Sequence, residues 1–546
     1  MTTPLRRTLT HLTKLLPTPR DYSALRTSWR SDLIAGLTVG IVALPLALGF
    51  GVSSGAGAEA GIITAIIAGI IAAVFGGSHI QVSGPTGAMV VVIAPIIATY
   101  GTRALPLVTL LAGIIVLVAG ALRLGRLVSF IPWPVIEGFT AGIGITIFLQ
   151  QIPAITGATP TSNHTIIAAG QALLSATPLY LAWALVMVAI VWACMTYLPA
   201  LHPAIPGSLV AIILATGLTV ALTTPLTTIG TLPHSLPAPS MPDLTPALVA
   251  NLAPAAATIA ALAAIESLLS ARVAASMSPT GAYDPDRELV GQGLASVGAA
   301  FFGGMPATGA IARTAVNVKA GARTRVAAIT HSLVLVLVIA VAAGPVEHIP
   351  LAALAGVLMM TAIRMIDVAT TRAILGSTRS DAVAYIITAI ITVSVDLIVA
   401  VGIGIAVAAF LLLRTLSRTT TVTFEDLPGN PTHGDQHIAT VRIDGPLFFA
   451  AADRVLDAVT QIDDVSVVIV RVSHLGIVDA TGAHVLAQIV QQLEQRGMTV
   501  LMKGIQSSHL ELFRRVGVLD ALADKGHLFQ DLDLAVSYAR RHVNAS

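Results

Sequence analysis

The chain has 546 residues, of which 55% are hydrophobic and only 11% are charged, and its mean hydropathy is +0.85. Soluble proteins carry about 25% charged residues, so this composition excludes an ordinary soluble protein and indicates one that lies in a lipid bilayer. The formal net charge of +2 gives no reason to expect nucleic-acid binding, and the single cysteine, Cys194, excludes an intramolecular disulfide framework.

Residues 1–32 are interpreted as a basic cytoplasmic leader, because they contain six Lys and Arg residues and no apolar signal-peptide core. Residues 33–418 are interpreted as an all-α membrane domain with about 14 spans, at roughly 20 residues per crossing. The predicted spans are 33–54, 57–76, 85–100, 104–122, 131–151, 177–198, 203–222, 247–271, 287–302, 307–320, 326–343, 349–364, 380–394 and 396–415. Some are short, as expected where a helix breaks in mid-membrane and its end is buried in protein.

The loop charges predict the orientation of the chain. Basic residues gather in the leader and in the loops after 104–122, 247–271, 307–320 and 349–364. An even number of predicted spans separates these segments, so they all lie on the same side of the membrane. The opposite loops, 152–176 and 223–246, contain no Lys or Arg, and Arg103 is the one exception. Because basic loops stay in the cytoplasm, both termini are predicted to be cytoplasmic in a multi-pass protein of the cell membrane.

Two segments match each other: residues 76–88 read GGSHIQVSGPTGA and residues 303–310 read GGMPATGA. Each follows one predicted span and opens a short one. These short spans are numbers 3 and 10, seven apart, so the second half is predicted to be inverted relative to the first. Paired Gly/Pro interruptions of this kind mark the binding sites of secondary transporters. The alternative is that both are ordinary turns between packed spans.

A helix that begins in mid-membrane presents free backbone N–H groups and the positive end of its dipole. Proline suits the first turn of a helix, so Pro85 and Pro306 are expected there, and glycine lets a ligand approach the backbone. Two such ends that face each other would attract an anion without a metal or another cofactor. The matched segments therefore predict a site for a small anion.

Two ionisable residues lie inside predicted spans: Glu266 in 247–271 and Arg313 in 307–320. Charges at such depth cost about 2.5–3.5 kcal/mol on insertion scales and usually face a cavity or a partner. Arg313 would add positive charge beside the second helix end. Burial favours a neutral carboxyl, so Glu266 is a candidate proton carrier or cation ligand. The alternative is a structural Glu266–Arg313 pair that does not touch substrate.

Other chemistries find no support in the sequence. There is no GxxxxGK[ST] loop for ATP-driven transport, no HExxH and no metal-ligand cluster. Neither an enzyme activity nor a cofactor is predicted.

Residues 419–546 hold 10 of the 30 Lys and Arg residues and read as a soluble domain. Their patterns predict strands at 438–443, 465–472 and 500–502, and helices at 479–496, with Asp479 as N-cap, and at 507–516. Alternation of strands and helices is typical of a small α/β layer domain.

Residues 32–40 (DLIAGLTVG), 81–88 (QVSGPTGA) and 306–314 (PATGAIART) resemble the sulfate permease (SulP) family of anion transporters. The C-terminal domain is similar to the STAS domain of that family. The resemblance implies a 7+7 inverted repeat, core and gate subdomains, elevator-like movement and a homodimer. It implies substrates such as sulfate, bicarbonate, chloride and dicarboxylates, and the sequence looks closest to bacterial bicarbonate and dicarboxylate carriers.

The resemblance also assigns residues by position. The substrate-binding positions are Thr86, Gly87, Ala88, Gly309, Ala310 and Arg313. Glu266 and Ser270 match an Asp and a Thr that hold sodium in sodium-driven bicarbonate carriers, and Ile311 replaces a further Thr. Loss of that hydroxyl argues against sodium, and the longer Glu266 suits a proton. Thr481 matches a phosphorylated hydroxyl of soluble STAS relatives, although a capped helix start also explains that loop.

The sequence therefore predicts a secondary active transporter that carries bicarbonate, sulfate or a dicarboxylate with a proton. A sodium-coupled bicarbonate symporter, an anion channel or uncoupled exchanger, and a membrane sensor that signals through its STAS domain stay open as alternatives. Which anion is carried is also left open.

Overall fold

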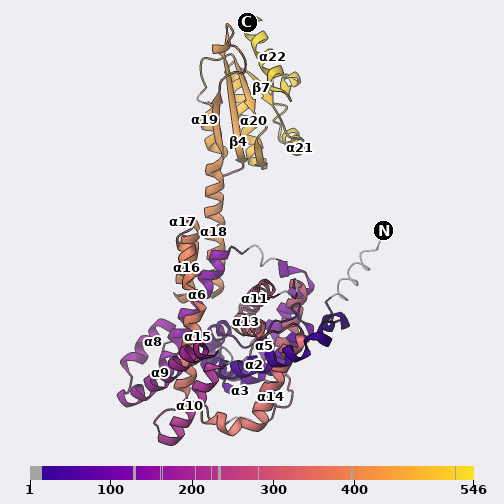
Figure 1. Ribbon diagram of the computed structural model, residues 1–546. Coiled ribbons are helices and arrows are strands. Elements are labelled where there is room, and N and C mark those ends of the chain that lie inside the picture. The colour runs from indigo at the N-terminus through magenta and orange to yellow at the C-terminus, as the bar shows by residue number, and fades with distance from the viewer. Residues whose placement is uncertain are drawn as a thin grey trace. The chain divides into compact units, whose positions relative to one another are not determined.

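A computed structural model describes residues 15–126, 131–159, 161–162, 164–202, 205–222, 224–231, 235–278, 280, 282–394, 397–460, 462–522 and 524–545. The chain divides into two compact units, Met1–Ile405 and Ala406–Ser546. The first unit is helical and the second is built around a sheet (Figure 1).

A helix lies in each predicted span. These helices are α2 (Leu25–Ser53), α3 (Ala58–Phe75), α4 (Gly87–Tyr100), α5 (Leu105–Ala121), α6 (Trp133–Gln150), α9 (Pro178–Leu201), α10 (Gly207–Leu222), α11 (Pro246–Met277), α12 (Pro285–Phe301), α13 (Ile311–Lys319), α14 (Arg325–Glu347), α15 (Leu351–Met365), α17 (Arg379–Ser394) and α18 (Leu397–Thr419). Among the described helices, nine are long and apolar enough to cross a membrane, so the number of 14 crossings stays a prediction. The shorter helices α7 (Ile152–Thr156), α8 (Thr165–Leu174) and α16 (Val368–Leu375) were not predicted.

Helix α2 begins at Leu25, whereas the predicted first span begins at residue 33. It therefore includes Arg26 and Arg30, which the sequence assigned to the leader. No Gly or Pro lies between Leu25 and Gly36 to end the helix. Long arginine side chains can also reach toward water while their stems stay on the helix, so these charges do not break it.

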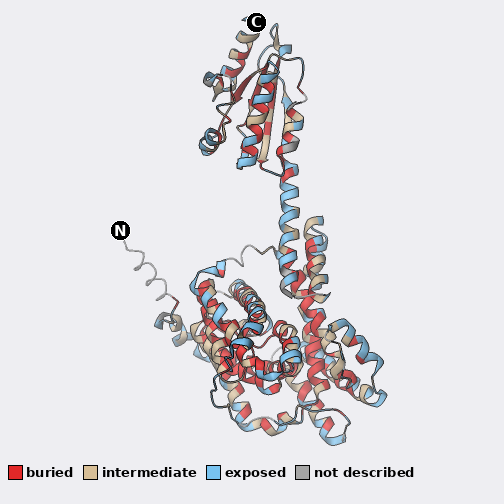
Figure 2. Ribbon diagram, turned by 180° about the vertical axis from the view of Figure 1, so that it is seen from behind, coloured by how far each residue is buried: buried red, intermediate tan, exposed pale blue. Residues whose placement is uncertain are grey.

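Two sets of helices pack closely in the first unit, and we name them the core group and the gate group after the predicted subdomains, which stay a prediction. In the core group, α12 packs against α3 and α5, α14 packs against α2 and α3, and α4, α5 and α13 pack against α11. In the gate group, α15 and α17 pack against α6, while α9 packs against α10 and α15. Figure 2 shows that buried residues follow the facing sides of these helices.

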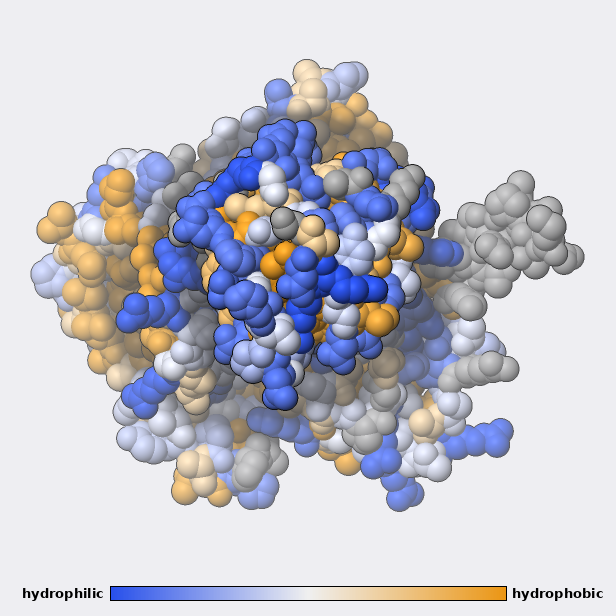
Figure 3. All heavy atoms as spheres, turned by 90° about the horizontal axis from the view of Figure 1, so that it is seen from above, coloured by the Kyte–Doolittle hydropathy of each residue, from blue (hydrophilic) through white to orange (hydrophobic). Residues whose placement is uncertain are grey.

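Large hydrophobic side chains also cover much of the outside of the first unit. Ile34, Leu174, Leu337 and Ile390 are each more than half exposed, and Figure 3 shows hydrophobic residues of this kind at the surface. Soluble proteins rarely expose apolar area on this scale. The outer faces of these helices are therefore suited to lipid.

The second unit confirms the predicted α/β domain. Its strands are β3 (Thr421–Glu425), β4 (Ile438–Leu447), β5 (Val467–Arg471), β6 (Leu475–Val478), β7 (Thr499–Lys503) and β8 (Leu528–Phe529). The sheet order is β3-β4-β5-β7-β8, with β6 beside β4, and every pair except β3–β4 is parallel. Helices α19 (Ala452–Thr460), α20 (Ala480–Gln495) and α21 (Ser507–Val516) cover one face, and α22 (Leu532–Ala545) covers part of the other.

The predicted cap of α20 is confirmed, because Asp479 Oδ1 accepts a hydrogen bond from the Gly482 N–H at 2.7 Å. Thr481 is exposed in the first turn of this helix, and its modification stays a prediction. Strands β3, β6 and β8 and helices α19 and α22 were not predicted from the sequence.

Candidate functional site

The two matched segments meet inside the core group, and the place where residues 82–84 lie against residues 308–310 is called the crossing. Each contains a strand of two residues, β1 (Ser83–Gly84) and β2 (Thr308–Gly309), and these strands pair antiparallel. The Ala310 N–H extends the pairing, since it donates to the Val82 carbonyl at 2.8 Å. Antiparallel pairing requires the two segments to run in opposite directions, which is the relation that an inverted repeat predicts.

Glycine is needed at this crossing because neighbouring groups approach the backbone closely. A Cβ atom on Gly84 would lie 2.7 Å from Nη1 of Arg313, and the φ of Gly84 is +155°. A Cβ atom on Gly309 would lie 1.6 Å from Nε2 of Gln81. A side chain at Gly84 would displace the Arg313 guanidinium, and one at Gly309 would displace the Gln81 amide.

Both segments end in helix N-termini at the crossing. Helix α4 begins at Gly87 after the N-cap Thr86, and α13 begins at Ile311 after the N-cap Ala310. The first N–H groups of each helix have no carbonyl partner within the helix, because that pattern starts at the fifth residue. Gly87 and Ala88 are buried, and Ala310 is 7% exposed. The N-terminus of α4 is therefore buried, whereas that of α13 is partly open, because Ile311 and Ala312 are exposed.

The expected place of the prolines was wrong. Pro85 and Pro306 lie before the N-caps of α4 and α13, outside the first helical turns. On the α13 side, β2 (Thr308–Gly309) lies between Pro306 and the helix, so the helix begins later. On the α4 side, Pro85 follows β1 directly and precedes the N-cap Thr86.

Glu266 of α11 reaches the crossing and contacts both segments. Its Oε2 accepts a hydrogen bond from the Thr86 hydroxyl at 2.7 Å and another from the Thr308 hydroxyl at 2.8 Å. The two hydroxyl oxygens are themselves 3.0 Å apart. One carboxyl oxygen and two hydroxyls thus form a closed triangle of oxygens next to the N-terminus of α4.

Arg313 lies in the first turn of α13 and is 2% exposed. Its Nη2 donates to the carbonyl of Pro85, in the opposite segment. Its Nη1 has no hydrogen-bond partner among the residues that the structure describes. Among the described residues, no ion pair joins Glu266 to Arg313. The Arg313 guanidinium therefore adds positive charge beside the helix ends that a direct ion pair does not neutralise.

The structure brings the predicted site residues together, with the Ser270 hydroxyl beside Thr314 and not in the oxygen triangle of Glu266. The Ser270 hydroxyl is completely buried and lies 3.4 Å from the Thr314 hydroxyl. A Cβ atom on Gly309 would lie 3.1 Å from the Ser270 Cβ, so Ser270 is packed against β2. Ile311 is 37% exposed at the start of α13. The assignment of Ser270 to a coupling ion stays a prediction.

Sequence reasoning missed Thr308, the second hydroxyl partner of Glu266. A usable signal was present, because Thr-Gly-Ala occurs in both segments, as Thr86-Gly87-Ala88 and as residues 308–310. Two further hydroxyls, which bond backbone N–H groups of the crossing, were also missed. Ser267 accepts from the Gly309 N–H, and Thr314 accepts from the Val82 N–H, at 3.1 and 3.0 Å.

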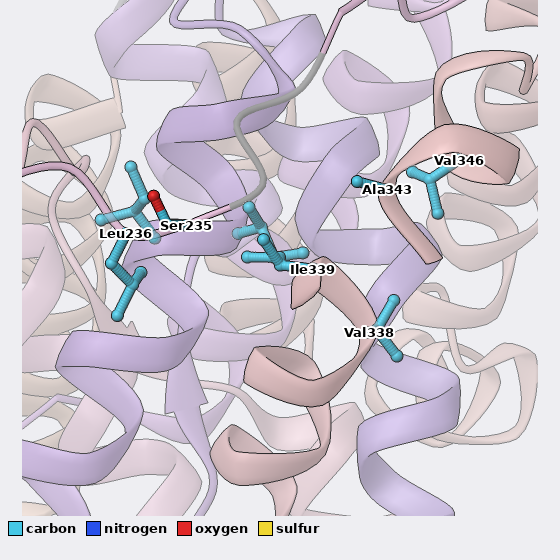
Figure 4. Close-up of a pocket in the computed structure, with 8 residues that line it drawn as sticks. Ser235, Leu236, Val338, Ile339, Ala343 and Val346 are labelled. Atoms are coloured by element: carbon cyan, nitrogen blue, oxygen red, sulfur yellow. The ribbon is translucent and has the colours of Figure 1, made fainter. Parts of the chain in front are cut away.

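A separate pocket lies between α3, α14 and the loop around residue 235 (Figure 4). Its lining consists of Ile62, Ile63, Ser235, Leu236, Val338, Ile339, Ala343 and Val346. Seven of these side chains are apolar, and burying an anion among them would cost more free energy than they could return. The crossing of the matched segments is therefore the candidate anion site.

Comparisons with known proteins agree with the geometry. The sulfate permease family matches residues 29–388, and the STAS domain matches residues 431–535. The chain is 34% identical over 516 residues to YvdB of Bacillus subtilis, a protein named for sulfate transport, with 92% of this chain and 97% of that protein covered.

Two solved structures are similar to this one. The transmembrane domain of the cyanobacterial bicarbonate transporter BicA is 35% identical, with a TM-score of 0.61 over 69% of this chain and 98% of that chain. The murine Slc26a9 anion transporter is 18% identical, with a TM-score of 0.83 over 97% of this chain and 95% of that chain, a likeness in fold.

Proposed function

Because this chain belongs to the sulfate permease family of anion transporters, we propose that it is a secondary active transporter that moves a small anion together with a proton. The anion is bicarbonate, sulfate or a dicarboxylate, and it binds between the N-termini of α4 and α13. The substrate-binding groups are the backbone of residues 86–88 and of Gly309 and Ala310, together with Arg313. No cofactor takes part.

The helix ends supply the attraction for the anion. Free N–H groups and the positive ends of two helix dipoles stabilise negative charge, and the effect is larger where water is excluded. Arg313 adds a buried formal charge at the same place. The Gly309 and Ala310 N–H groups already donate to Ser267 and Val82, so on this side the free donors would be the first N–H groups of α13 itself, at residues 311–313. With those of α4, an anion would meet N–H donors from both halves of the chain at once.

The oxygen triangle at Glu266 is the observation that carries the proposal of proton coupling. A hydroxyl donates one proton, so an ionised Glu266 leaves two protons for the three short contacts with Thr86 and Thr308. A proton on Oε2 raises the number to three, and each oxygen then donates once and accepts once. Glu266 can thus gain or lose a proton while both hydroxyls stay hydrogen-bonded to it, beside the anion site.

Sodium-coupled bicarbonate symport is the second candidate. The same three oxygens could contribute to a cation site, and BicA is named for bicarbonate transport. The proton is favoured because Ser270, the further oxygen that such a site would use, is directed toward Thr314 instead.

Alternating access is proposed to be elevator-like, with the core group moving against the gate group. The anion site lies within the core group, where α4, α11 and α13 all contribute. The proposal includes cytoplasmic termini, location in the cell membrane and a homodimer, as the loop charges and the family resemblance imply.

Uptake into proteoliposomes tests the proposed coupling. Labelled bicarbonate or sulfate uptake should rise several-fold when a proton gradient is imposed without sodium. Glu266→Gln should abolish this response yet still permit exchange of internal for external anion. The amide keeps the polar contacts, but it cannot bind and release a proton as a carboxyl group does. Thr219→Val is a matched control, since that buried hydroxyl bonds only the Ala215 carbonyl of its own helix.

The alternatives make different predictions for the same vesicles. Uptake that requires sodium and ignores the proton gradient would reject proton coupling in favour of the sodium symporter. Electrical currents far above the turnover of a carrier would identify a channel.

A further inference from the structure

A second buried carboxyl lies in the core group, and the proposed transport cycle does not use it. Glu288, in the first turn of α12, is 1% exposed. Its Oε2 accepts hydrogen bonds from the Gly77 and Ser78 N–H groups at 2.8 and 3.0 Å. Its Oε1 accepts from Nε2 of Gln292, one turn further along α12, at 2.9 Å. Glu288 therefore holds the start of the segment that leads to α4.

The same network also reaches the end of that segment. Nε2 of Gln292 donates at 2.6 Å to the hydroxyl of Ser83, which is the first residue of β1. From Ser83 the chain passes through Gly84 and Pro85 to Thr86, the N-cap of α4. Helix α12 thus bonds the segment at both ends, through the carboxylate of Glu288 and the amide of Gln292.

Backbone packing leaves this segment little room to move. A Cβ atom on Gly291 of α12 would lie 2.4 Å from the backbone of Gly76. A Cβ atom on Gly77 would lie 1.9 Å from the Asp284 carbonyl oxygen. Where backbones touch so closely, a shift of α12 must be transmitted to the segment.

We propose that Glu288 is a positioning residue for the anion site, because its carboxylate and Gln292 together set the place of the N-terminal end of α4. The inference rests on the proposed function and deepens its account of the same site. Glu288 differs in kind from Glu266. All three partners of Glu288 are N–H donors, so its network is complete with an ionised carboxylate, whereas the hydroxyl partners of Glu266 can both donate and accept.

Glu288→Ala removes the acceptor of two buried N–H groups and frees the segment. Misplacement of a binding group by about 1 Å can cost roughly 100-fold in activity, so the KM for sulfate or bicarbonate should rise at least tenfold. The maximal rate per folded transporter should change far less, because at saturation the bound anion itself holds the N-terminus of α4, and with it Thr86, in place. Full-length protein in proteoliposomes, with potassium salts of both anions, provides these values.

Glu288→Gln is the conservative partner of this variant. The new amide oxygen can still accept from Gly77 and Ser78. Gln292 can turn its own amide so that its oxygen, which has no partner among the described residues, accepts from the new NH2 group and from Ser83. Both KM and the pH dependence of uptake should then stay within about threefold of the wild type, which corresponds to less than 1 kcal/mol.

Three results would overturn the inference. Glu288→Ala that lowers the melting temperature while KM stays constant would make Glu288 merely structural. Glu288→Gln that alters the pH profile would make it a proton carrier. If Glu288→Ala does not fold, Gln292→Met decides. This variant removes the amide that bonds Ser83 and Glu288 but leaves the Glu288 carboxylate on the Gly77 and Ser78 N–H groups, and it should still raise KM. An unchanged KM would reject the proposal.

Arg313→Ala, measured beside these variants, separates the inference from the proposed function. If Arg313→Ala weakens anion uptake while Glu288→Ala and Gln292→Met do not, the positioning role alone is rejected. If Arg313→Ala also has no effect, the anion site lies elsewhere and both proposals are rejected.

Discussion

The segment before α4 and the segment before α13 meet in one crossing, but different kinds of group hold them. Residues 76–86 are held mainly by charged or amide side chains: the carboxylate of Glu288, the amide of Gln292 and the guanidinium of Arg313. The Thr314 hydroxyl adds one contact, at the Val82 N–H. Apart from the Thr308 side chain, which bonds Glu266, residues 302–310 are held at their backbone N–H groups by hydroxyls. Thr64 accepts from the Met305 N–H at 2.7 Å, Ser296 from the Ala307 N–H at 3.2 Å, and Ser267 from the Gly309 N–H.

This difference indicates where the site is vulnerable. Hydrogen bonds to charged groups contribute about 1.5–3 kcal/mol each, against about 0.5–1.5 kcal/mol for neutral ones. The longer segment before α4 therefore depends on a few strong contacts, whereas the shorter segment before α13 depends on several weak ones. Single substitutions should damage the α4 side more than the α13 side.

Arg313→Ala should have the largest effect, since Arg313 belongs to one segment's helix and bonds the other segment. The variant removes the buried positive charge and releases the Pro85 carbonyl. Loss of one positioned donor can cost roughly 100-fold or more in rate, and we expect uptake in proteoliposomes to fall by at least that factor. Arg379→Ala, at an exposed position, is the control and should transport normally. Uptake preserved in Arg313→Ala would favour the membrane-sensor alternative.

The two Gly-Gly pairs provide a direct contrast in stability. Alanine at Gly77 would place Cβ against the Asp284 carbonyl, a backbone atom, so α12 or the segment must shift, at a cost of about 1–3 kcal/mol or more. Alanine at Gly303 meets nothing within 4 Å and suffers only from its φ of +76°, at a cost of about 1–2 kcal/mol. Melting temperatures of the purified variants measure both. Equal losses, or a larger loss for Gly303→Ala, would contradict the proposed asymmetry.

The smallest effect is expected at Asp21, in the short helix η1 (Pro19–Tyr22), which forms an ion pair with Arg287 of α12. Its carboxylate accepts two hydrogen bonds from Arg287, at 3.1 and 2.7 Å. Asp21→Asn should lower stability by about 1 kcal/mol, as for a good ion pair near a surface.

The pH dependence of this variant follows from the pKa of Asp21. Burial tends to raise that pKa, but hydrogen bonds from Arg287 and the Thr18 N–H, with the charges of Arg287 and Arg325, lower it to about 2. A lowered pKa contributes stability that is present above the unfolded value of 3.8 and is lost as the pH falls toward 2. The destabilisation should therefore be equal at pH 5 and pH 8. A difference that vanishes at pH 5 would show that Asp21 is not held as described.

The parts of the site that could be predicted are those with a local signal. A charge within an apolar run singled out Glu266 and Arg313, and repeated Gly, Pro and Thr residues singled out the two segments. Strands β1 and β2 could not be predicted, because two residues are too few for any periodicity to appear. Their pairing is a contact between residues more than 200 positions apart.

Glu288 escaped notice for a different reason. It follows Asp286 and Arg287 at the predicted cytoplasmic end of a span, where charged residues are ordinary. Only the packing of α12 against the Gly76-Gly77 turn reveals that this carboxylate faces inward. The α/β architecture of the second unit was easier to predict, since Val-rich strands and a capped helix carry their pattern in the chain itself.

The antiparallel pairing of β1 and β2 has a mechanical consequence. Backbone hydrogen bonds join the two halves of the repeat at the very place where the anion would sit, with Ser83 opposite Gly309 and Gly84 opposite Thr308. A movement that separated the N-termini of α4 and α13 would break these hydrogen bonds. The pairing therefore favours the proposed elevator-like movement, in which both helix ends move together and only their surroundings change.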